Sequence, residues 1–177
     1  MREYDYSRPG GYFVTVCTAE KRALFGEIIA DEMRMNNAGR IVESEWFRTG
    51  VVRPNLMLDA FVIMPNHIHG IIIISDDGTA TARATRRVAP TMASGSLGAI
   101  IGQFKSVVTK RINQLRGTPA AYVWQRNYYE HVIRNEDELS RIRQYIVTKP
   151  LQWALDRENP DRVGGNPEED WVYRGSI

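Results

Sequence analysis

The 177-residue sequence predicts an α+β protein with one antiparallel sheet and helices packed on one or both of its faces. Residues 58–74 contain two apolar, β-branched runs on either side of Pro65-Asn66, which is typical of two adjacent strands joined by a tight turn. Stretches of helical periodicity lie before and after this pair. The order along the chain is therefore strand, helix, strand, strand, helix, extended segment and helix.

The composition is that of one ordinary globular domain, with 43% hydrophobic and 25% charged residues. The formal net charge of +2 only weakly favours an anionic partner. Cys17 is the single cysteine, which excludes a disulfide framework and a cysteine-rich zinc site. We find no signal peptide and no apolar run long enough to span a bilayer, so we expect a cytoplasmic protein without a membrane partner.

The first half of the chain begins with a strand at residues 11–18, which are rich in aromatic and β-branched side chains. Residues 24–35 contain two short apolar pieces that predict a small hairpin. Asn36 or Asn37 is suited to cap a helix that runs to about Thr49, because an apolar stripe follows at helical spacing.

The second half opens with a polar stretch at about 75–96, which predicts either a solvated loop or a basic loop that closes over a phosphate backbone. Its basic residues are Arg83, Arg86 and Arg87. Residues 97–115 then show a continuous apolar helical face and contain no acidic residue. The cations of that helix are Lys105, Lys110 and Arg111, which indicate a solvated surface or a nucleic-acid surface.

Residues 122–133 are dense in aromatic side chains and predict a strand or extended segment. Rings near Arg126 could pack in the core or stack on unpaired bases. A helix is expected from Asn135 to about Lys149, and Tyr145 lies at the margin of its apolar stripe. Residues 151–177 predict a short helix followed by an irregular tail.

His67 and His69 lie at the start of the second central strand. Residues two apart in a strand project from the same face, so the two imidazoles point the same way. They are either two hydrogen-bonded histidines near a turn or two ligands of a divalent metal ion. No glycine-rich phosphate loop, Ser-His-Asp set or cysteine cluster offers a competing chemistry.

The string Met64-Pro-Asn-His-Ile-His-Gly70, followed by aliphatic residues, resembles the signature of the single-tyrosine HUH transposases, above all their REP-associated branch. The similarity extends over much of the chain, at residues 12–18, 24–27, 37–42, 124–134 and 145–150. It implies a ferredoxin-like sheet, a transposase domain at residues 1–150 and a C-terminal extension at 151–177. It also implies that His67 and His69 hold Mg²⁺ or Mn²⁺ and that Tyr145 is the nucleophile.

The implied activity is cleavage and rejoining of single-stranded DNA beside hairpins, through a 5′-phosphotyrosine intermediate. The partner is then hairpin-containing single-stranded DNA, and the protein acts as a monomer or a homodimer. A metal ion helps because a phosphodiester repels nucleophiles and a tyrosine hydroxyl has an ordinary pKa of about 10. The predicted DNA contacts are the basic residues Arg83, Arg86, Arg87, Lys105, Lys110, Arg111, Arg126 and Lys149.

Lys149 departs from the family pattern, in which the residue four positions after the tyrosine is usually Asn or Gln and completes the metal site. A lysine has no acceptor lone pair while it is protonated. Glu130, Asn127 or water could replace the ligand, Lys149 could contact phosphate directly, or the active site could be weakened. The alternative functions are a hairpin-binding descendant without catalysis and an unrelated metal hydrolase.

Overall fold

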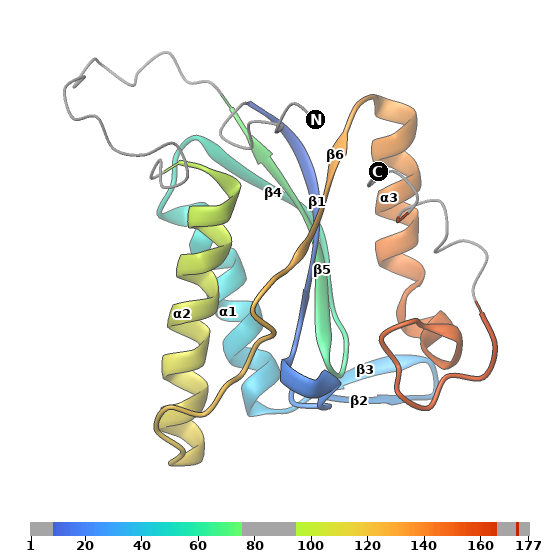
Figure 1. Cartoon of the computed structure of the whole chain (residues 1–177). Helices are drawn as coiled ribbons and strands as arrows, with labels where there is room; N and C mark the ends of the chain where they lie inside the picture. Colours follow the sequence, from blue (N-terminus) through green and yellow to red (C-terminus); the bar gives the residue numbers. More distant parts are fainter. Residues whose placement is uncertain (1–8, 76–94, 166–172, 174–177) are drawn as a thin grey trace.

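A four-stranded antiparallel sheet in the order β4-β5-β1-β6 forms the centre of the computed structural model, which describes residues 9–75, 95–165 and 173 (Figure 1). The strands are β1 (Gly10–Cys17), β4 (Leu56–Ile63), β5 (His67–Ile74) and β6 (Tyr129–Ile133). Helix α1 (Asn37–Val51) precedes the β4-β5 hairpin, and α2 (Leu97–Arg116) lies between β5 and β6. This arrangement is the ferredoxin-like β-α-β-β-α-β topology, so the predicted α+β class is confirmed.

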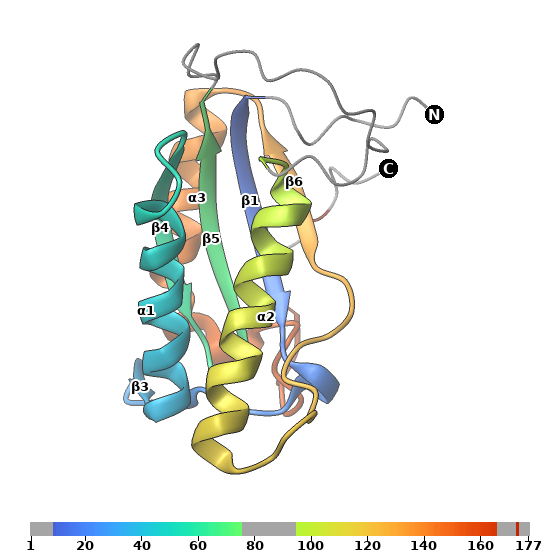
Figure 2. The same cartoon turned by 90° about the vertical axis from the view of Figure 1, so that its left-hand side faces the viewer.

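The sheet lies between two helical layers. Helices α1 and α2 cover one face, and α3 (Glu136–Thr148) covers the other (Figures 1 and 2). Side chains alternate along β1 accordingly. Tyr12 and Val14 belong to the large core beneath α1 and α2, whereas Phe13 packs with Ile142 and Ile146 of α3. Both faces of the sheet are therefore buried.

The short elements lie at the end of the sheet where β1 stops and β5 starts. The predicted hairpin is present as β2 (Gly26–Ile29) and β3 (Glu32–Met35). Its two turn residues, Ala30 and Asp31, have φ values of 50° and 62°, as a tight two-residue turn requires. A 3₁₀ turn, η1 (Ala19–Lys21), follows β1, and a second one, η2 (Pro150–Leu155), follows α3.

The predicted helix starts are confirmed by their capping side chains. Asn36 accepts hydrogen bonds from the amides of Ala38 and Gly39 at the start of α1. Asn135 accepts one from Glu138 at the start of α3, whose first turn carries three acidic residues. Pro150 follows the end of α3, at the predicted position.

The aromatic stretch at 122–133 contributes less strand than its composition suggests, because only Tyr129–Ile133 forms a strand beside β1, whereas Trp124 makes an isolated bridge to Thr18. Lys105 of α2 provides a physical reason. Its Nζ lies 2.6, 3.0 and 3.4 Å from the carbonyl oxygens of Gln125, Arg126 and Asn127. These carbonyls are held toward the helix, and the pairing beside β1 is interrupted between the Thr18–Trp124 bridge and Tyr129.

Candidate metal and tyrosine site

His67 and His69 project from β5 toward the α3 side of the sheet. The register pairs His69 with Thr15 and His67 with Cys17, on the face that also carries Phe13. Both imidazoles are fully buried, and their Nε2 atoms lie 3.0 Å apart. Two ligands at right angles around an ion about 2.1 Å away are about 3.0 Å apart, so the spacing suits adjacent metal ligands. The predicted common orientation of the two rings is confirmed.

The far nitrogens of both rings have polar partners, which fix how the rings are turned. His69 Nδ1 lies 2.9 Å from Thr15 Oγ1, and His67 Nδ1 lies 2.8 Å from Asn66 Oδ1. The Asn66 amide nitrogen donates to the carbonyls of Lys21 and Glu158, at 3.1 and 2.7 Å. Its oxygen therefore faces His67 and can only accept, so His67 carries its proton on Nδ1 and presents the Nε2 lone pair to the site.

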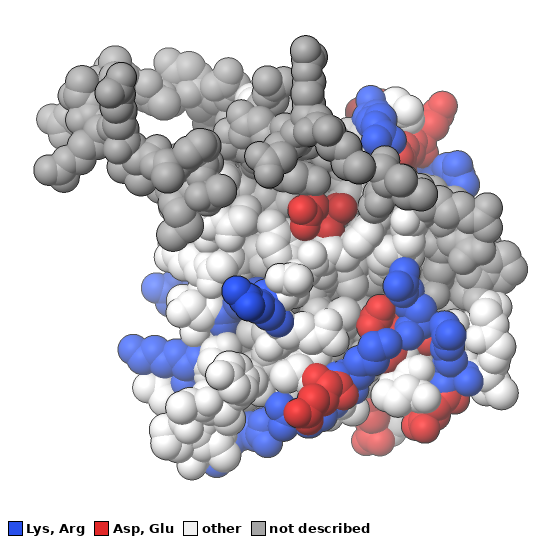
Figure 3. All heavy atoms as spheres, viewed as in Figure 1, with Lys and Arg blue, Asp and Glu red and all other residues white. Residues whose placement is uncertain are grey.

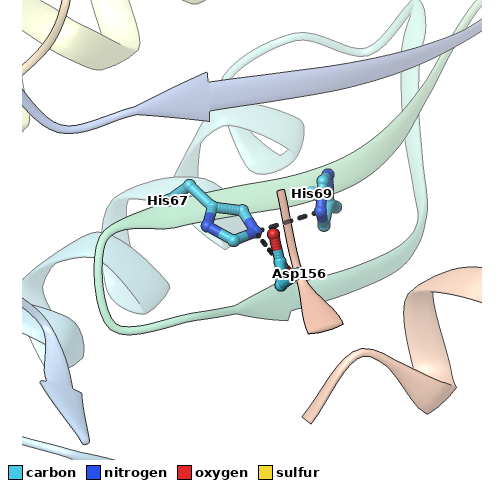
Figure 4. Close-up of side chains that lie close together, drawn as sticks. All are labelled: His67, His69 and Asp156. Atoms are coloured by element: carbon cyan, nitrogen blue, oxygen red, sulfur yellow. Dashed lines mark hydrogen bonds and ion pairs between the residues drawn. The ribbon is translucent and has the colours of Figure 1, made fainter. Parts of the chain in front are cut away.

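Asp156 completes the donor group from the segment after η2. Its Oδ2 lies 3.5 Å from His67 Nε2, and ligand atoms of His67, His69 and Asp156 all lie within 4.8 Å of one another (Figure 4). This oxygen is buried and also faces the Lys149 ammonium group, 2.8 Å away. Two imidazoles and one carboxylate form a donor set that divalent ions accept. The residues therefore fit a metal ion.

Tyr145 lies beside this group on α3. Its ring centroid is 5.4 Å from that of His69, and Phe13 packs against its edge at 6.0 Å. Only 3% of the residue is exposed. The margin position expected from the periodicity is therefore a buried position that faces the sheet, one helical turn before Lys149.

Lys149 is fully buried and lies at the end of α3. Its Nζ is 2.8 Å from Asp156 Oδ2 and 4.7 Å from the centre of the Tyr145 ring. The lysine thus contacts the carboxylate that also faces His67. The role of Lys149 as a DNA contact stays a prediction. Its side chain is enclosed in this structure.

Burial lowers the pKa of both histidines, that of His67 to about 4 and that of His69 well below its ordinary value. Asp156 partly opposes this effect at His67, whereas Lys149 adds to it at both rings. Burial opposes ionisation of Asp156, but His67 and Lys149 together bring the pKa of its carboxyl below the ordinary value. At neutral pH the site therefore holds neutral imidazoles and an ionised carboxylate, which are the protonation states of metal ligands.

Two aromatic side chains cover the site. Trp153 of η2 lies 6.2 Å from the His67 ring. Tyr173 lies with its hydroxyl 3.3 Å from Thr15 Oγ1 and its ring 4.5 Å from Tyr129. Burial raises the pKa of Tyr173 well above its ordinary value. The side chains of His67, His69 and Tyr145 are therefore enclosed in this structure.

The structure does not place the other ligand candidates, Glu130 and Asn127, at the site. Glu130 pairs with Val14, which belongs to the core beneath α1 and α2, so Glu130 lies on the opposite sheet face from the histidines. Asn127 is exposed before β6. Asp156 was not predicted from the sequence, because it lies beyond the segment that resembles the family. Its position seven residues after Lys149 gives no periodic signal.

The predicted DNA contacts Lys105, Lys110 and Arg111 lie on α2, across the sheet from the site. Lys110 and Arg126 are exposed, Arg111 pairs with Glu45 at 2.5 Å, and Lys105 holds backbone carbonyls. Figure 3 shows Lys and Arg side chains over α2, whereas both charges mix over the end where β2, β3 and η2 lie. Arg83, Arg86 and Arg87 fall outside the described residues. No helix in the described ranges is long and apolar enough to cross a membrane.

Known proteins resemble the chain over most of its length, although no family model matches it. An uncharacterized protein of Haemophilus influenzae is 36% identical over 162 residues, which cover 89% of each chain. The solved structure of a REP-associated tyrosine transposase bound to a REP hairpin superposes with a TM-score of 0.57 at 17% identity, and covers 100% of this chain and 87% of that one. A putative transposase from Deinococcus radiodurans gives a TM-score of 0.43 at 17% identity, over 84% and 95% of the two chains.

Proposed function

Since the chain belongs to the family of the Haemophilus influenzae protein and has the fold of a REP-associated tyrosine transposase, we propose that it cleaves and rejoins single-stranded DNA beside hairpins. The observation that carries this proposal is the position of Tyr145. Its ring lies 5.4 Å from His69, within a buried group of His67, His69 and Asp156 that suits a divalent ion. The resemblance of the Met64–Gly70 string to the HUH signature supports the same assignment.

In the proposed reaction, the Tyr145 oxygen forms a bond to the phosphorus of a phosphodiester, and the bond from phosphorus to the 3′ oxygen breaks. Tyrosine loses a proton, and the departing 3′ oxygen gains one. The phosphotyrosine conserves the bond energy, so a 3′ hydroxyl can later rejoin the strand without a nucleotide cofactor. Bound Mg²⁺ or Mn²⁺ would neutralise charge on the non-bridging phosphate oxygens.

Contacts within this chain orient the residues of that site before any substrate binds. Asn66 and Thr15 orient the two imidazoles, so their Nε2 atoms converge. The packing of α3 on the sheet holds Tyr145 against His69, which reduces the orientational freedom that the nucleophile must lose in the reaction. Hairpin DNA is the proposed partner, with the exposed Lys110 and Arg126 as phosphate contacts.

A second function, hairpin binding without catalysis, is favoured by the enclosure of the site. Tyr145 is 3% exposed, and Lys149 occupies the helix position where the family usually has Asn or Gln. A protein of this kind would bind hairpins whether or not a metal ion is present. It would form no covalent adduct.

The test uses single-stranded hairpins from the flanks of the gene, labelled at the 3′ end and incubated with Mn²⁺ or Mg²⁺. We expect a labelled protein band on a denaturing gel, because the 5′-phosphotyrosine retains the 3′ fragment. Tyr145→Phe and His67→Ala should each reduce the band at least about 100-fold, whereas Tyr122→Phe, an exposed tyrosine, should retain it. Hairpin binding without any band would favour the non-catalytic function, and released product without a band would indicate a hydrolase.

A further inference from the structure

Lys149 and the metal donor group share one carboxylate oxygen. Asp156 Oδ2 lies 2.8 Å from Lys149 Nζ and 3.5 Å from His67 Nε2. All three residues are fully buried, so water does not screen these contacts. The positive charge of Lys149 therefore lies next to any cation that binds His67, His69 and Asp156.

The charges of this group balance in the form that the structure describes. Asp156 supplies one negative charge, and Lys149, 2.8 Å away, supplies one positive charge. A divalent cation would add two positive charges next to the lysine. Like charges at such distances repel strongly in a buried environment. The two cations therefore compete for the same carboxylate.

We propose that Lys149 is a tethered counterion of the metal site, which pairs with Asp156 in the metal-free protein and must release it when a divalent ion binds. This inference rests on the metal site of the proposed function and adds the residue that sets its affinity. It also explains why a cation is tolerated at a position where the family has an amide. In this chain, the carboxylate arrives from the segment after η2, and the lysine neutralises it until an ion is bound.

The test measures Mn²⁺ binding without DNA, by the loss of the free Mn²⁺ signal in electron paramagnetic resonance. Lys149→Met removes the charge without adding a ligand, and we expect it to bind Mn²⁺ at least about tenfold more tightly than the unmodified protein. Lys149→Gln, which adds an amide oxygen, should bind at least as tightly as Lys149→Met. Asp156→Asn should bind at least about tenfold more weakly, because it removes the anionic ligand.

The matched control is Lys21→Met. Lys21 pairs with Glu158 at 3.3 Å, close to the site, but its contacts do not include Asp156. We expect its Mn²⁺ affinity to stay within about threefold of the unmodified protein, because its side chain is 42% exposed and water screens its charge. Unchanged or weaker Mn²⁺ binding in Lys149→Met would overturn the proposal.

Thermal unfolding provides a second measurement, since Lys149→Met leaves Asp156 without its counterion and lowers the stability of the metal-free protein. We expect Mn²⁺ to raise the melting temperature of Lys149→Met by more than that of the unmodified protein. If the single variant does not fold, Lys149→Met combined with Asp156→Asn removes both charges. The double variant should fold and bind Mn²⁺ more weakly than the unmodified protein, and equal binding would overturn the proposal. None of these measurements depends on DNA cleavage, so the adduct assay can fail independently.

Discussion

Asn66 contacts three segments that meet at the candidate site. Its amide nitrogen donates to a carbonyl of η1 and to that of Glu158, and its oxygen faces His67. It is 1% exposed, so water does not replace these partners. One side chain thereby fixes the orientation of a metal ligand and the position of the chain next to Asp156.

Asn66→Ala should therefore affect both folding and metal binding. The substitution leaves two partly buried carbonyls and one buried imidazole nitrogen without their partner, and we expect the free energy of unfolding to fall by about 2–4 kcal/mol. Loss of an orienting partner also weakens metal binding by about 10–100-fold. Urea unfolding and Mn²⁺ titration check these two effects.

The matched control for this experiment is Asn127→Ala, at an exposed asparagine outside the regular elements. We expect both its stability and its Mn²⁺ affinity to stay close to those of the unmodified protein. A variant Asn66→Ala that is destabilised but binds Mn²⁺ normally would limit the role of Asn66 to folding.

The contact of β5 with α1 depends on Gly70, the glycine of the Met64–Gly70 string. A Cβ atom at this position would lie 2.3 Å from Trp46 Cζ2 and 2.6 Å from Trp46 Cη2. The Trp46 indole stacks on Phe61 at a centroid distance of 4.6 Å and is almost completely buried. Strand β5, which carries both histidines, can therefore pack against α1 only if residue 70 has no side chain.

Gly70→Ala should destabilise the protein by about 1–3 kcal/mol, because a packed indole has no free space into which it can move. Trp46→Phe in the same chain removes the atoms that clash, so the double variant should lose less stability than the two single changes predict together. Chemical denaturation of the four proteins measures this coupling.

Gly102→Ala is the matched control, since no atom lies within 4 Å of the added carbon and alanine favours a helix. It should keep or slightly raise the stability of the protein. Additive losses in the Gly70 and Trp46 variants would show that the two positions are not coupled.

The regular elements could be predicted from the sequence because their signals are local. Asn36 and Asn135 cap helices that follow them directly, and Pro150 marks the end of α3. The alternation of side chains along β5 is sufficient to put both histidines on one face of the sheet. The extent of β6 was not predictable in this way, because Lys105 approaches its preceding carbonyls from another element.

The site was predictable only in part, because some of its residues come together through contacts between elements that are distant in the sequence. His67, His69 and Tyr145 lie in segments with a strand pattern, a helical pattern and a family resemblance. Asp156 lies far from His67 along the chain, and no periodicity links the two. The enclosure of Lys149 depends on η2 and the segment after it, which composition alone describes as an irregular tail.

At the scale of the whole molecule, the sheet separates two polar regions. The candidate site lies on the α3 side, whereas the exposed Lys110 lies on α2, across the sheet (Figure 1). A groove of about 770 Å³ between α1 and α2 is lined by both apolar and polar side chains, and its basic residues are Arg48, Arg53, Lys110 and Arg111. Under the proposed function, we therefore expect the hairpin stem to bind on the α2 face and the strand to be attacked on the α3 face.

This separation predicts that DNA affinity and metal binding can be changed independently. Lys110→Gln and Arg126→Gln should each weaken hairpin binding and lower the slope of log affinity against log salt by about one per lost phosphate contact. Their Mn²⁺ affinity should equal that of the unmodified protein. Fluorescence anisotropy at several salt concentrations tests the first effect. Glu32→Gln, an exposed change on β3, is the control, and unchanged salt slopes would contradict the assignment.

Asp156 follows the sheet and helices α1, α2 and α3 in the order of synthesis, and chains fold as they emerge from the ribosome. A nascent chain that extends to the end of α3 already contains the two histidines and Tyr145, but it lacks the carboxylate. Under the proposed function, such a chain cannot hold the divalent ion in its complete site. We therefore expect chains truncated before Asp156 to bind Mn²⁺ more weakly than longer chains that include it.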